Sequence, residues 1–351
     1  MFADVVPFGP GEQATLIAPH LRNQFDIDFF SLTKRHLNTS RVENGDHWFE
    51  YELGQRNWLG AARQLGLLLR RREYALVHTW DRQSTRLTKW VMFAAGRWAR
   101  RAAWVRQAFD ESSSGPKSIT GLIQRMREPD WMLGDPWLLE SAQAADKSTA
   151  IRLAVPSPSP KNMALRTARQ LPADVKLIGT VCQLDSRSGL KHLIWALDQI
   201  KCVRDDLRLI VWGSGSQKEQ FRWYARQIDI LDWIDWRSPR SDVRAEMTGL
   251  DMYWHAPRTE ATPPELVAAL TSGLPAIAPR TAATAELAQT WSTTLAMVSW
   301  GARDEIARQT QQWLQHGWPF LDQSVAAKWT QAHAPAVVAK EYALTYERLI
   351  F

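Results

Sequence analysis

Short apolar runs alternate with longer amphipathic stretches along the whole chain. The apolar runs have the length of strands that are buried in a parallel sheet. The amphipathic stretches repeat apolar residues at helical spacing, which predicts helices that bury one face. Strands are expected at residues 3–8, 25–32, 48–53, 74–78, 104–109, 131–133, 149–155, 176–182, 207–212, 233–236, 250–254 and 275–278. Helices are expected at residues 13–21, 58–69, 84–99, 119–126, 137–144, 161–170, 190–201, 218–228, 243–248, 266–270, 304–315, 324–330 and 336–350. This alternation predicts an α/β protein with parallel sheets that helices cover on both faces.

The segment Pro156-Ser-Pro-Ser-Pro160 divides this pattern into two parts. Alternating proline favours a stiff, extended linker, and a chain of 351 residues is long enough for two domains. We therefore expect a first domain at residues 1–155, a hinge at 156–160, a second domain at 161–335 and a final helix at 336–351.

The stretch 258–279 contains the clearest chemical signal. Its apolar helix is bracketed by Pro263-Pro264 and by Gly273-Leu-Pro275, an order that is typical of a helix start and a helix end. Strand candidates stand on both sides, so the order is strand, loop, helix and strand. Ligands of open parallel sheets bind beyond the carboxyl ends of the strands, where this loop lies. Glu260 stands in the loop, ahead of the helix.

This stretch resembles the donor-sugar motif of retaining glycosyltransferases with the GT-B fold (glycosyl transferases group 1, or family 4-like). That motif begins with Glu and ends with a second Glu, small residues and Gly-Leu-Pro. The positions in register are Glu260, Ala261, Thr262, Pro263, Gly273 and Pro275. Ala268 replaces the family's second Glu, and Glu265 is nearby but about one helical turn out of register.

The resemblance implies two Rossmann-like domains, each a doubly wound parallel sheet, that face a cleft, with the final helix crossing back to the first domain. It implies transfer of a sugar, with retention, from an activated and nucleotide-linked donor to a glycan or lipid acceptor. Glu260 would bind donor-sugar hydroxyls, and the backbone at Ala261 and Thr262 would offer N–H groups. The nucleotide sugar would be a substrate, and neither a cofactor nor a metal ion is expected.

The residues for the donor phosphates depart from the family's pattern. Gln183 and Ser188 replace the Arg and Lys that neutralise the diphosphate leaving group, whereas Gly189 is retained. Cation contacts to such a leaving group contribute strongly to catalysis. Arg187 and Arg258 are the nearest substitutes for phosphate binding, although Arg187 is equally typical of a solvated loop arginine.

In the first domain, Gly9 and Gly11 follow the strand at 3–8 and precede a helix. Such a loop can bind phosphate through backbone N–H groups, and a tight turn is the alternative. His78 ends a strand in a segment that resembles the family's His-x-His-Asp sequence. It is the catalytic candidate, with a structural role as the alternative, because Phe109 occupies the place of the family's other His and a phenyl ring cannot accept a proton.

Four departures from the family's pattern leave a second function open. They are Phe109, Gln183, Ser188 and Ala268. A GT-B protein that had lost the chemistry would act as a module that binds glycans or nucleotide sugars, or as a scaffold.

The chain is basic, with a formal net charge of +6 and a pI of about 9.4. Clusters such as Arg70-Arg71-Arg72 suit an anionic partner, and solvated helix faces are the alternative. The 19 tryptophans also suit a surface that contacts lipid headgroups or sugar rings. These features favour peripheral contact with an anionic membrane over nucleic acid, since no RNA-binding signature is present.

The location is expected to be the cytoplasm, with peripheral contact at the inner membrane. Cys182 and Cys202 imply no disulfide framework and fit a reducing compartment. No apolar run approaches the roughly 18 residues of a membrane span, and Asp4 and Pro7 interrupt any signal-peptide pattern.

Overall fold

The computed structural model describes residues 8–32, 47–50, 58–95, 102–108, 129–135, 139, 147–168, 172, 174–239, 242–259, 261–319 and 322–351. The chain divides into two compact units. Unit 1 comprises Met1–Pro156 and His333–Phe351, and unit 2 comprises Ser157–Ala332. The segment from Pro156 to Pro160, where the chain passes from one unit to the other, has no helix or strand and is mostly exposed.

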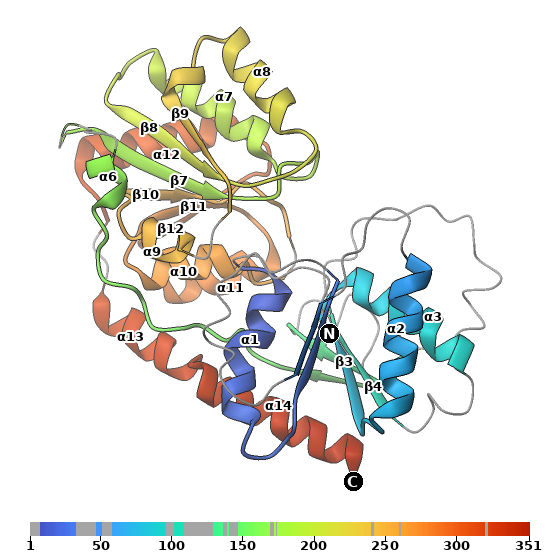
Figure 1. The fold of residues 1–351 in the computed structure, drawn as a ribbon. Coiled ribbons are helices and arrows are strands. Elements are labelled where there is room, and N and C mark those ends of the chain that lie inside the picture. The colour runs from blue at the N-terminus through green and yellow to red at the C-terminus, as the bar shows by residue number, and fades with distance from the viewer. Residues whose placement is uncertain are drawn as a thin grey trace. The chain divides into compact units, whose positions relative to one another are not determined.

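Unit 2 is built on a six-stranded parallel sheet with the order β12-β11-β10-β7-β8-β9 (Figure 1). The strands are β7 (Lys176–Val181), β8 (Leu207–Trp212), β9 (Ile234–Arg237), β10 (Met252–Trp254), β11 (Ala276–Pro279) and β12 (Leu295–Val298). The chain begins at β7, adds β8 and β9 on one side, and then places β10 on the other side of β7. The connections from β7 and β10 therefore lead in opposite directions, which makes the gap between their carboxyl ends a topological switch point.

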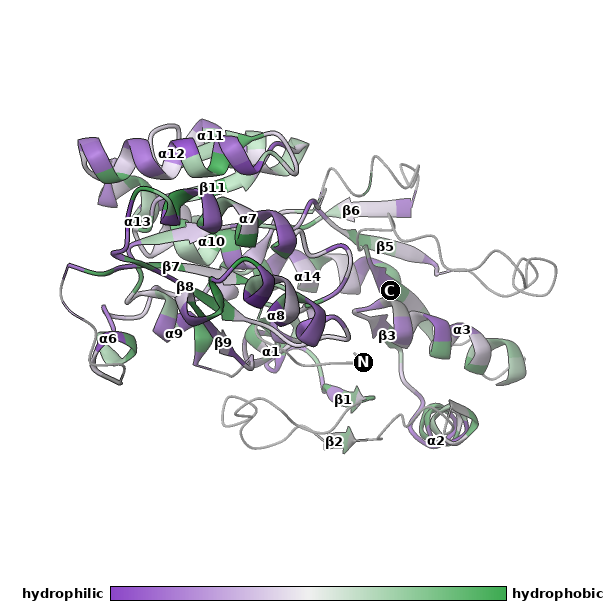
Figure 2. Ribbon diagram, turned by 90° about the horizontal axis from the view of Figure 1, so that it is seen from above, coloured by the Kyte–Doolittle hydropathy of each residue, from purple (hydrophilic) through white to green (hydrophobic). Residues whose placement is uncertain are grey.

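Helices bury their apolar faces against this sheet. They are α6 (Ala164–Ala168), α7 (Leu190–Lys201), α8 (Lys218–Gln227), α9 (Val243–Met247), α10 (Pro264–Thr271), α11 (Ala282–Thr290), α12 (Arg303–His316) and α13 (Gln323–Ala332), with a 3-10 turn at Leu231–Trp233. In α7 the buried residues recur at helical spacing, among them Leu190, Leu193, Leu197 and Ile200, and they join one core cluster with β8. α8 is polar apart from buried positions such as Phe221, so both hydropathy colours run along it (Figure 2).

Unit 1 contains a four-stranded parallel sheet with the order β3-β4-β5-β6 and a separate parallel pair, β1-β2. The strands are β1 (Asp28–Ser31), β2 (His47–Glu50), β3 (Leu76–Thr79), β4 (Ala103–Gln107), β5 (Trp131–Gly134) and β6 (Ser148–Ala150). The helices are α1 (Pro10–Leu21), α2 (Trp58–Arg71), α3 (Arg82–Ala95) and α14 (Pro335–Ile350).

The C-terminal helix α14 belongs to unit 1, although the chain reaches it only after unit 2 (Figure 1). Its buried residues Val338, Ala339, Tyr342, Ala343 and Tyr346 lie on one face and share a core cluster with α1. Two polar contacts also hold the C-terminal segment to unit 1. The Val155 N–H donates to the His333 carbonyl over 2.8 Å, and Arg152 forms an ion pair with Glu341. The final helix therefore returns to the first unit, as the resemblance implies.

The expected α/β architecture with parallel sheets is confirmed in both units. α7 and β8 have the bounds that the sequence pattern predicts, whereas the strand expected at 149–155 ends at Ala150. β12 is not predicted, because its run Leu-Ala-Met-Val is short and half of it has weak strand preference. Residues 3–7 and 119–126, and most of 137–144, lie outside the described residues. Within the described ranges, no helix combines the length and the apolar character that crossing a membrane requires.

Candidate functional site

The candidate site lies at the switch point of unit 2, where the loops after β7 and β10 leave the sheet. The loop after β7 leads through Gly189 into α7, and the loop after β10 leads through Pro263 into α10. Two helix N-termini therefore begin beside the same strand ends. Helix N-termini carry partial positive charge and unpaired N–H groups, so this corner favours an anion.

Gly189 allows the two loops to pack together. Its φ of +68° is in the left-handed region, and a Cβ at this position would lie 2.4 Å from the carbonyl oxygen of Ala256. Only glycine combines this backbone conformation with so close an approach. The residue that the family pattern retains is therefore needed for the geometry of the switch point.

The loop after β7 presents few charges to a ligand. Gln183 is exposed, but Ser188 is buried, and its hydroxyl donates to the Asp185 carbonyl over 2.8 Å while accepting the Leu190 N–H over 3.3 Å. Ser188 therefore shapes the start of α7 rather than facing solvent. Arg187 is mostly exposed and pairs with Asp185 of its own loop at 3.3 Å, which matches a solvated loop arginine.

The loop after β10 carries the donor-sugar motif. Arg258 is exposed, and Glu260 itself lies outside the described residues. The Ala261 N–H, expected to be offered to a donor, instead donates to the Thr259 hydroxyl over 3.1 Å. A ligand that used this N–H would have to displace the Thr259 side chain, and Thr262 beside it is half-buried. Ala268 is buried inside α10 and brings no acceptor to the site.

A buried His–Glu pair lies below these loops, and the sequence analysis did not single it out as a site. His255 follows β10 directly and is 1% exposed, and its Nδ1 lies 3.5 Å from Oε1 of Glu265 in the first turn of α10. Among the described residues, neither ring nitrogen of His255 has a hydrogen-bond partner. Burial lowers the pKa of His255 to about 3 and raises the pKa of Glu265 to about 7. One feature of the sequence could have indicated this pair: Glu265 is an acidic residue in the first turn of an almost wholly apolar helix.

In unit 1, Gly9 and Gly11 lie at the start of α1. Gly9 is the residue before the helix and Gly11 is buried within its first turn. The loop is held by Glu12, whose carboxylate accepts the Phe8 N–H over 2.6 Å. The described loop thus forms a tight, self-bonded turn into the helix, and its role toward phosphate stays a prediction.

His78 lies in the core of unit 1. Its Nδ1 is 2.6 Å from the hydroxyl oxygen of Tyr346, and its ring stacks on Trp80 with centroids 4.3 Å apart. Burial holds the pKa of His78 well below its ordinary value, so the ring is neutral at physiological pH. These buried contacts and the lowered pKa favour the structural role for His78. Phe109, at the place of the family's other His, lies outside the described residues.

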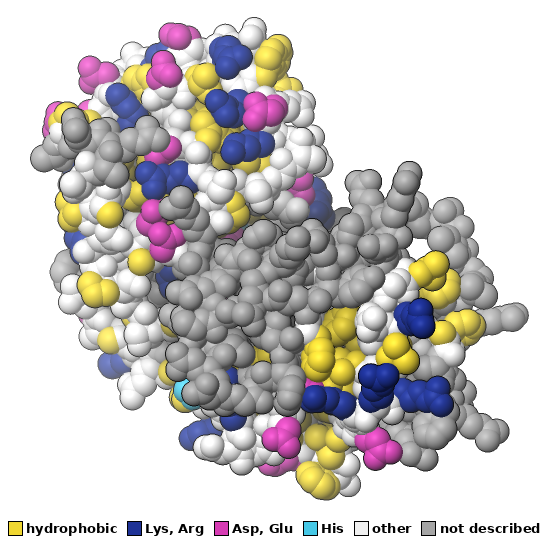
Figure 3. All heavy atoms as spheres, in the orientation of Figure 1, with side chains coloured by type: hydrophobic (Ala, Val, Ile, Leu, Met, Phe, Trp, Pro, Cys, Tyr) yellow, Lys and Arg dark blue, Asp and Glu magenta, His cyan; other side chains and the backbone are white. Residues whose placement is uncertain are grey.

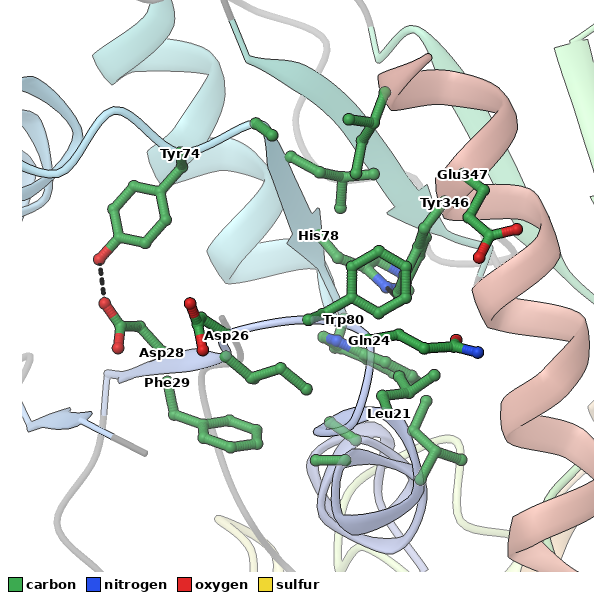
Figure 4. A pocket seen from close by; sticks show the side chains of 18 of the residues that line it. Leu21, Gln24, Asp26, Asp28, Phe29, Tyr74, His78, Trp80, Tyr346 and Glu347 are labelled. Carbon is green, nitrogen blue, oxygen red and sulfur yellow. Dashed lines mark hydrogen bonds between the residues drawn. The ribbon is translucent and has the colours of Figure 1, made fainter. Parts of the chain in front are cut away.

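A cavity of about 400 Å³ opens in unit 1 beside His78 (Figure 4). It is lined by α1, the start of β1, β3 together with Trp80 that follows it, and the last turn of α14, and the Tyr74 hydroxyl donates to Asp28 in this lining. Its charged lining residues are acidic, namely Asp26, Asp28 and Glu347, and carboxylates do not suit the phosphates of a donor. We therefore place the candidate site in unit 2 and not in this cavity.

Among the residues that the structure describes, no cluster of His, Cys, Asp or Glu could hold a metal ion.

Comparison with known proteins agrees with this geometry. Residues 163–330 match the family model of glycosyl transferases group 1. HepE of Anabaena in complex with UDP-glucose has a TM-score of 0.77 at 17% identity, over 99% of this chain and 98% of that chain. Sucrose-phosphate synthase from Thermosynechococcus elongatus has a TM-score of 0.71 at 15% identity, over 97% and 92%. WaaG, a glycosyltransferase involved in lipopolysaccharide biosynthesis, has a TM-score of 0.65 at 13% identity, over 99% and 98%. No curated relative matches the sequence.

These structural similarities establish the fold of the whole chain. The family match covers nearly all of unit 2, including β7, the loop around Gly189 and the donor-sugar motif. The chain therefore has the GT-B fold, and residues 163–330 match the family model of glycosyl transferases group 1.

Proposed function

We propose that this protein transfers a sugar from a nucleotide-linked donor to a glycan or lipid acceptor, with retention of configuration and without a metal ion. The observation that carries the proposal is the family match across a unit whose two helix N-termini meet at a switch point. HepE binds UDP and UDP-glucose, which makes a uridine donor the first to test. Glu260 is proposed to bind hydroxyls of the donor sugar.

The test is a panel of UDP-glucose, GDP-mannose and ADP-glucose, read as protection against thermal unfolding and then by calorimetry. A ligand that binds the folded protein raises the unfolding midpoint by mass action. We expect one member to protect the wild type and to lose its effect with Glu260→Gln, whose own midpoint should match the wild type. If none of the three protects at any concentration, the proposed donor class is wrong.

The alternative is a silent protein that binds nucleotide sugars or glycans without transfer. The buried Ser188, where the family has a Lys, and Ala268, where it has a Glu, favour this alternative. Release of the nucleotide from the donor distinguishes the two. An active enzyme releases it faster when an acceptor extract is added, whereas a binding module holds the donor intact.

We further propose that unit 1 contacts an anionic membrane, which would bring a lipid acceptor to the enzyme. The contact would use the α2–α3 surface, defined by Leu59, Arg63 and Arg71 of α2 and Arg86, Trp90 and Phe93 of α3. Leu59 is 82% exposed, and Trp90 and Phe93 are also exposed. Neither helix contains Asp or Glu. Basic and hydrophobic side chains gather together over this part of unit 1 (Figure 3).

Exposed apolar side chains among arginines fit a surface of anionic lipid, where each cation contributes about 1 kcal/mol and the rings enter the headgroup layer. Flotation with phosphatidylcholine vesicles, with and without phosphatidylglycerol, tests this contact. Binding should require phosphatidylglycerol, weaken with salt, and fall with Trp90→Ser/Phe93→Ser. Trp223→Ser, which removes an exposed tryptophan from α8 in unit 2, is the matched control. If Trp223→Ser reduced vesicle binding as much as Trp90→Ser/Phe93→Ser, the α2–α3 surface would be excluded as the membrane contact.

A further inference from the structure

We propose that Glu265 meets the donor's phosphate as a neutral carboxylic acid, with His255 positioned behind it, so that binding of the donor takes up a proton. This inference rests on the proposed function of the same site. It assigns a ligand-binding role to a side chain that is not one of the motif's matching positions.

The place of the pair carries the argument. His255 directly follows β10, and the next residue, Ala256, packs against Gly189 at the start of α7. Glu265 occupies the first turn of α10. The pair therefore lies at the switch point, between the two helix N-termini where the fold binds anions. The side chain of Glu265 remains 16% exposed, whereas His255 is sealed beneath it.

The pair is unusual because a buried imidazole normally has hydrogen-bond partners. In the part of the chain that the structure describes, both nitrogens of His255 lack one, and Oε1 of Glu265 lies 3.5 Å from Nδ1. Within the described residues, no hydrogen bond therefore fixes the imidazole of His255 or satisfies its nitrogens. Such an arrangement can take up a proton when an anion arrives.

The titratable groups around Glu265 come from three parts of unit 2. Cys182 directly follows β7 and is acted on by Asp185 in the loop after that strand. Tyr253 lies in β10 and His255 directly after it, and Arg244 lies on α9. Burial has the largest effect on Glu265 and raises its pKa to about 7, while Arg244 acts in the opposite direction. Burial also raises the pKa of the Cys182 thiol to about 12, so that this neighbour stays neutral.

Charge balance then explains why a proton is needed. The side chains that occupy the family's Arg and Lys positions are neutral here, since Gln183 is an amide and Ser188 is a buried hydroxyl. An ionised Glu265 would repel a diphosphate at short range, whereas its acid form can donate an O–H to a phosphate oxygen. A ligand that binds only the protonated form must draw a proton from solvent, because binding and protonation are linked.

The experiment is calorimetric titration with UDP-glucose at pH 6 and pH 8, or with whichever member of the donor panel binds best. A nucleotide sugar is the right probe because its diphosphate, unlike a terminal phosphate with a second pKa near 6, does not titrate in this range. With the pKa of Glu265 near 7, the wild-type Kd should be about tenfold weaker at pH 8 than at pH 6. Heats measured at pH 8 in two buffers of different ionisation enthalpy should report uptake of close to one proton.

Glu265→Gln keeps the shape and a permanent N–H donor, so its Kd should be the same at both pH values. Glu219→Gln, at an exposed carboxylate on α8, should keep the wild-type pH dependence. Donor binding with equal Kd at pH 6 and pH 8 in the wild type, or an unchanged dependence in Glu265→Gln, overturns this inference and leaves the proposed function intact. If no member of the panel binds even at pH 6, the inference falls together with the proposed function.

Discussion

The hydroxyl oxygen of Tyr346 lies 2.6 Å from Nδ1 of His78, which joins the last helix of the chain to the third strand of unit 1. His78, which sequence similarity suggests for catalysis, therefore makes a buried contact with Tyr346 instead. Tyr342 on the same helix donates to Gln107 over 3.2 Å, so α14 supplies polar as well as apolar partners to this core.

Tyr346→Phe should lower the free energy of unfolding by about 1–3 kcal/mol, because it leaves a buried imidazole nitrogen without this partner. Chemical denaturation followed by circular dichroism measures the loss. Tyr224→Phe, which keeps the ring contact with Lys191 in unit 2, should change stability by less than about 0.5 kcal/mol. Equal effects of the two substitutions would contradict the importance of the His78 contact.

Gly189→Ala should destabilise unit 2 and weaken donor binding, since the added methyl group would collide with the Ala256 carbonyl at a positive φ. Gly317→Ala is the matched control, because Gly317 also has a positive φ, of +92°, but has no atom within 4 Å of the added Cβ. We expect Gly317→Ala to lower the free energy of unfolding by about 1–2 kcal/mol, from backbone strain alone. Gly189→Ala should lower it by clearly more. If the two losses are the same, close packing at the switch point is not what requires glycine.

Gln183→Arg should strengthen donor binding, because position 183 is exposed at the end of β7 and a charged hydrogen bond contributes about 1.5–3 kcal/mol. Ser188→Lys should instead lower the thermal midpoint without a gain in affinity, since Ser188 is buried and its hydroxyl holds the turn into α7. Calorimetry and thermal melts of the two single variants separate these effects. A gain in affinity from Ser188→Lys would mean that the loop opens to present this position.

Glu265→Gln should stabilise unit 2 at pH 8 and have little effect at pH 5. Burial raises the folded-state pKa to about 7 from an ordinary value of 4.5, so the folded protein binds this proton more tightly than the unfolded chain. The stability contributed by Glu265 is therefore present at low pH and lost as the pH rises through 7, by about 1–3 kcal/mol. Denaturation midpoints from pH 5 to pH 8 measure this. A difference between variant and wild type that does not change with pH would contradict a raised pKa.

Limited proteolysis should cut the chain first near Ser157 and Pro158, which are exposed where the chain passes between units. Alternating proline keeps this segment extended and free of helix or strand. Mass spectrometry of the first fragments identifies the cut. Early cleavage within 176–200, with this segment intact, would contradict the assignment of a hinge.

Much of unit 2 could be predicted from the sequence because its signals are local. The run at 207–212 is largely apolar, and the stretch at 190–201 repeats buried residues at helical spacing, so β8 and α7 have the expected bounds. β12 escaped prediction because an edge strand of four residues depends on pairing with β11 more than on its own composition.

The candidate site could be predicted only in part. Gly189 was singled out because the family's pattern retains it, and the structure shows its left-handed φ of +68°, while its role toward phosphate stays a prediction. Whether the hydroxyl of Ser188 faces a ligand or bonds to its own loop depends on the local backbone and the side-chain rotamer, which residue type does not encode. Glu265 resembled an ordinary acidic residue in a first helical turn, and only the tertiary structure places it against the buried His255.

The path of the chain through the two units has a consequence for protein synthesis. Unit 2 is one continuous segment, whereas unit 1 lacks α14 until the ribosome has translated His333–Phe351. Domains that emerge complete fold as they appear, so the second unit can close its core before the first. Until the final helix is released, the face of α1 that α14 covers stays open, and a nascent chain stalled before residue 335 would present it to chaperones.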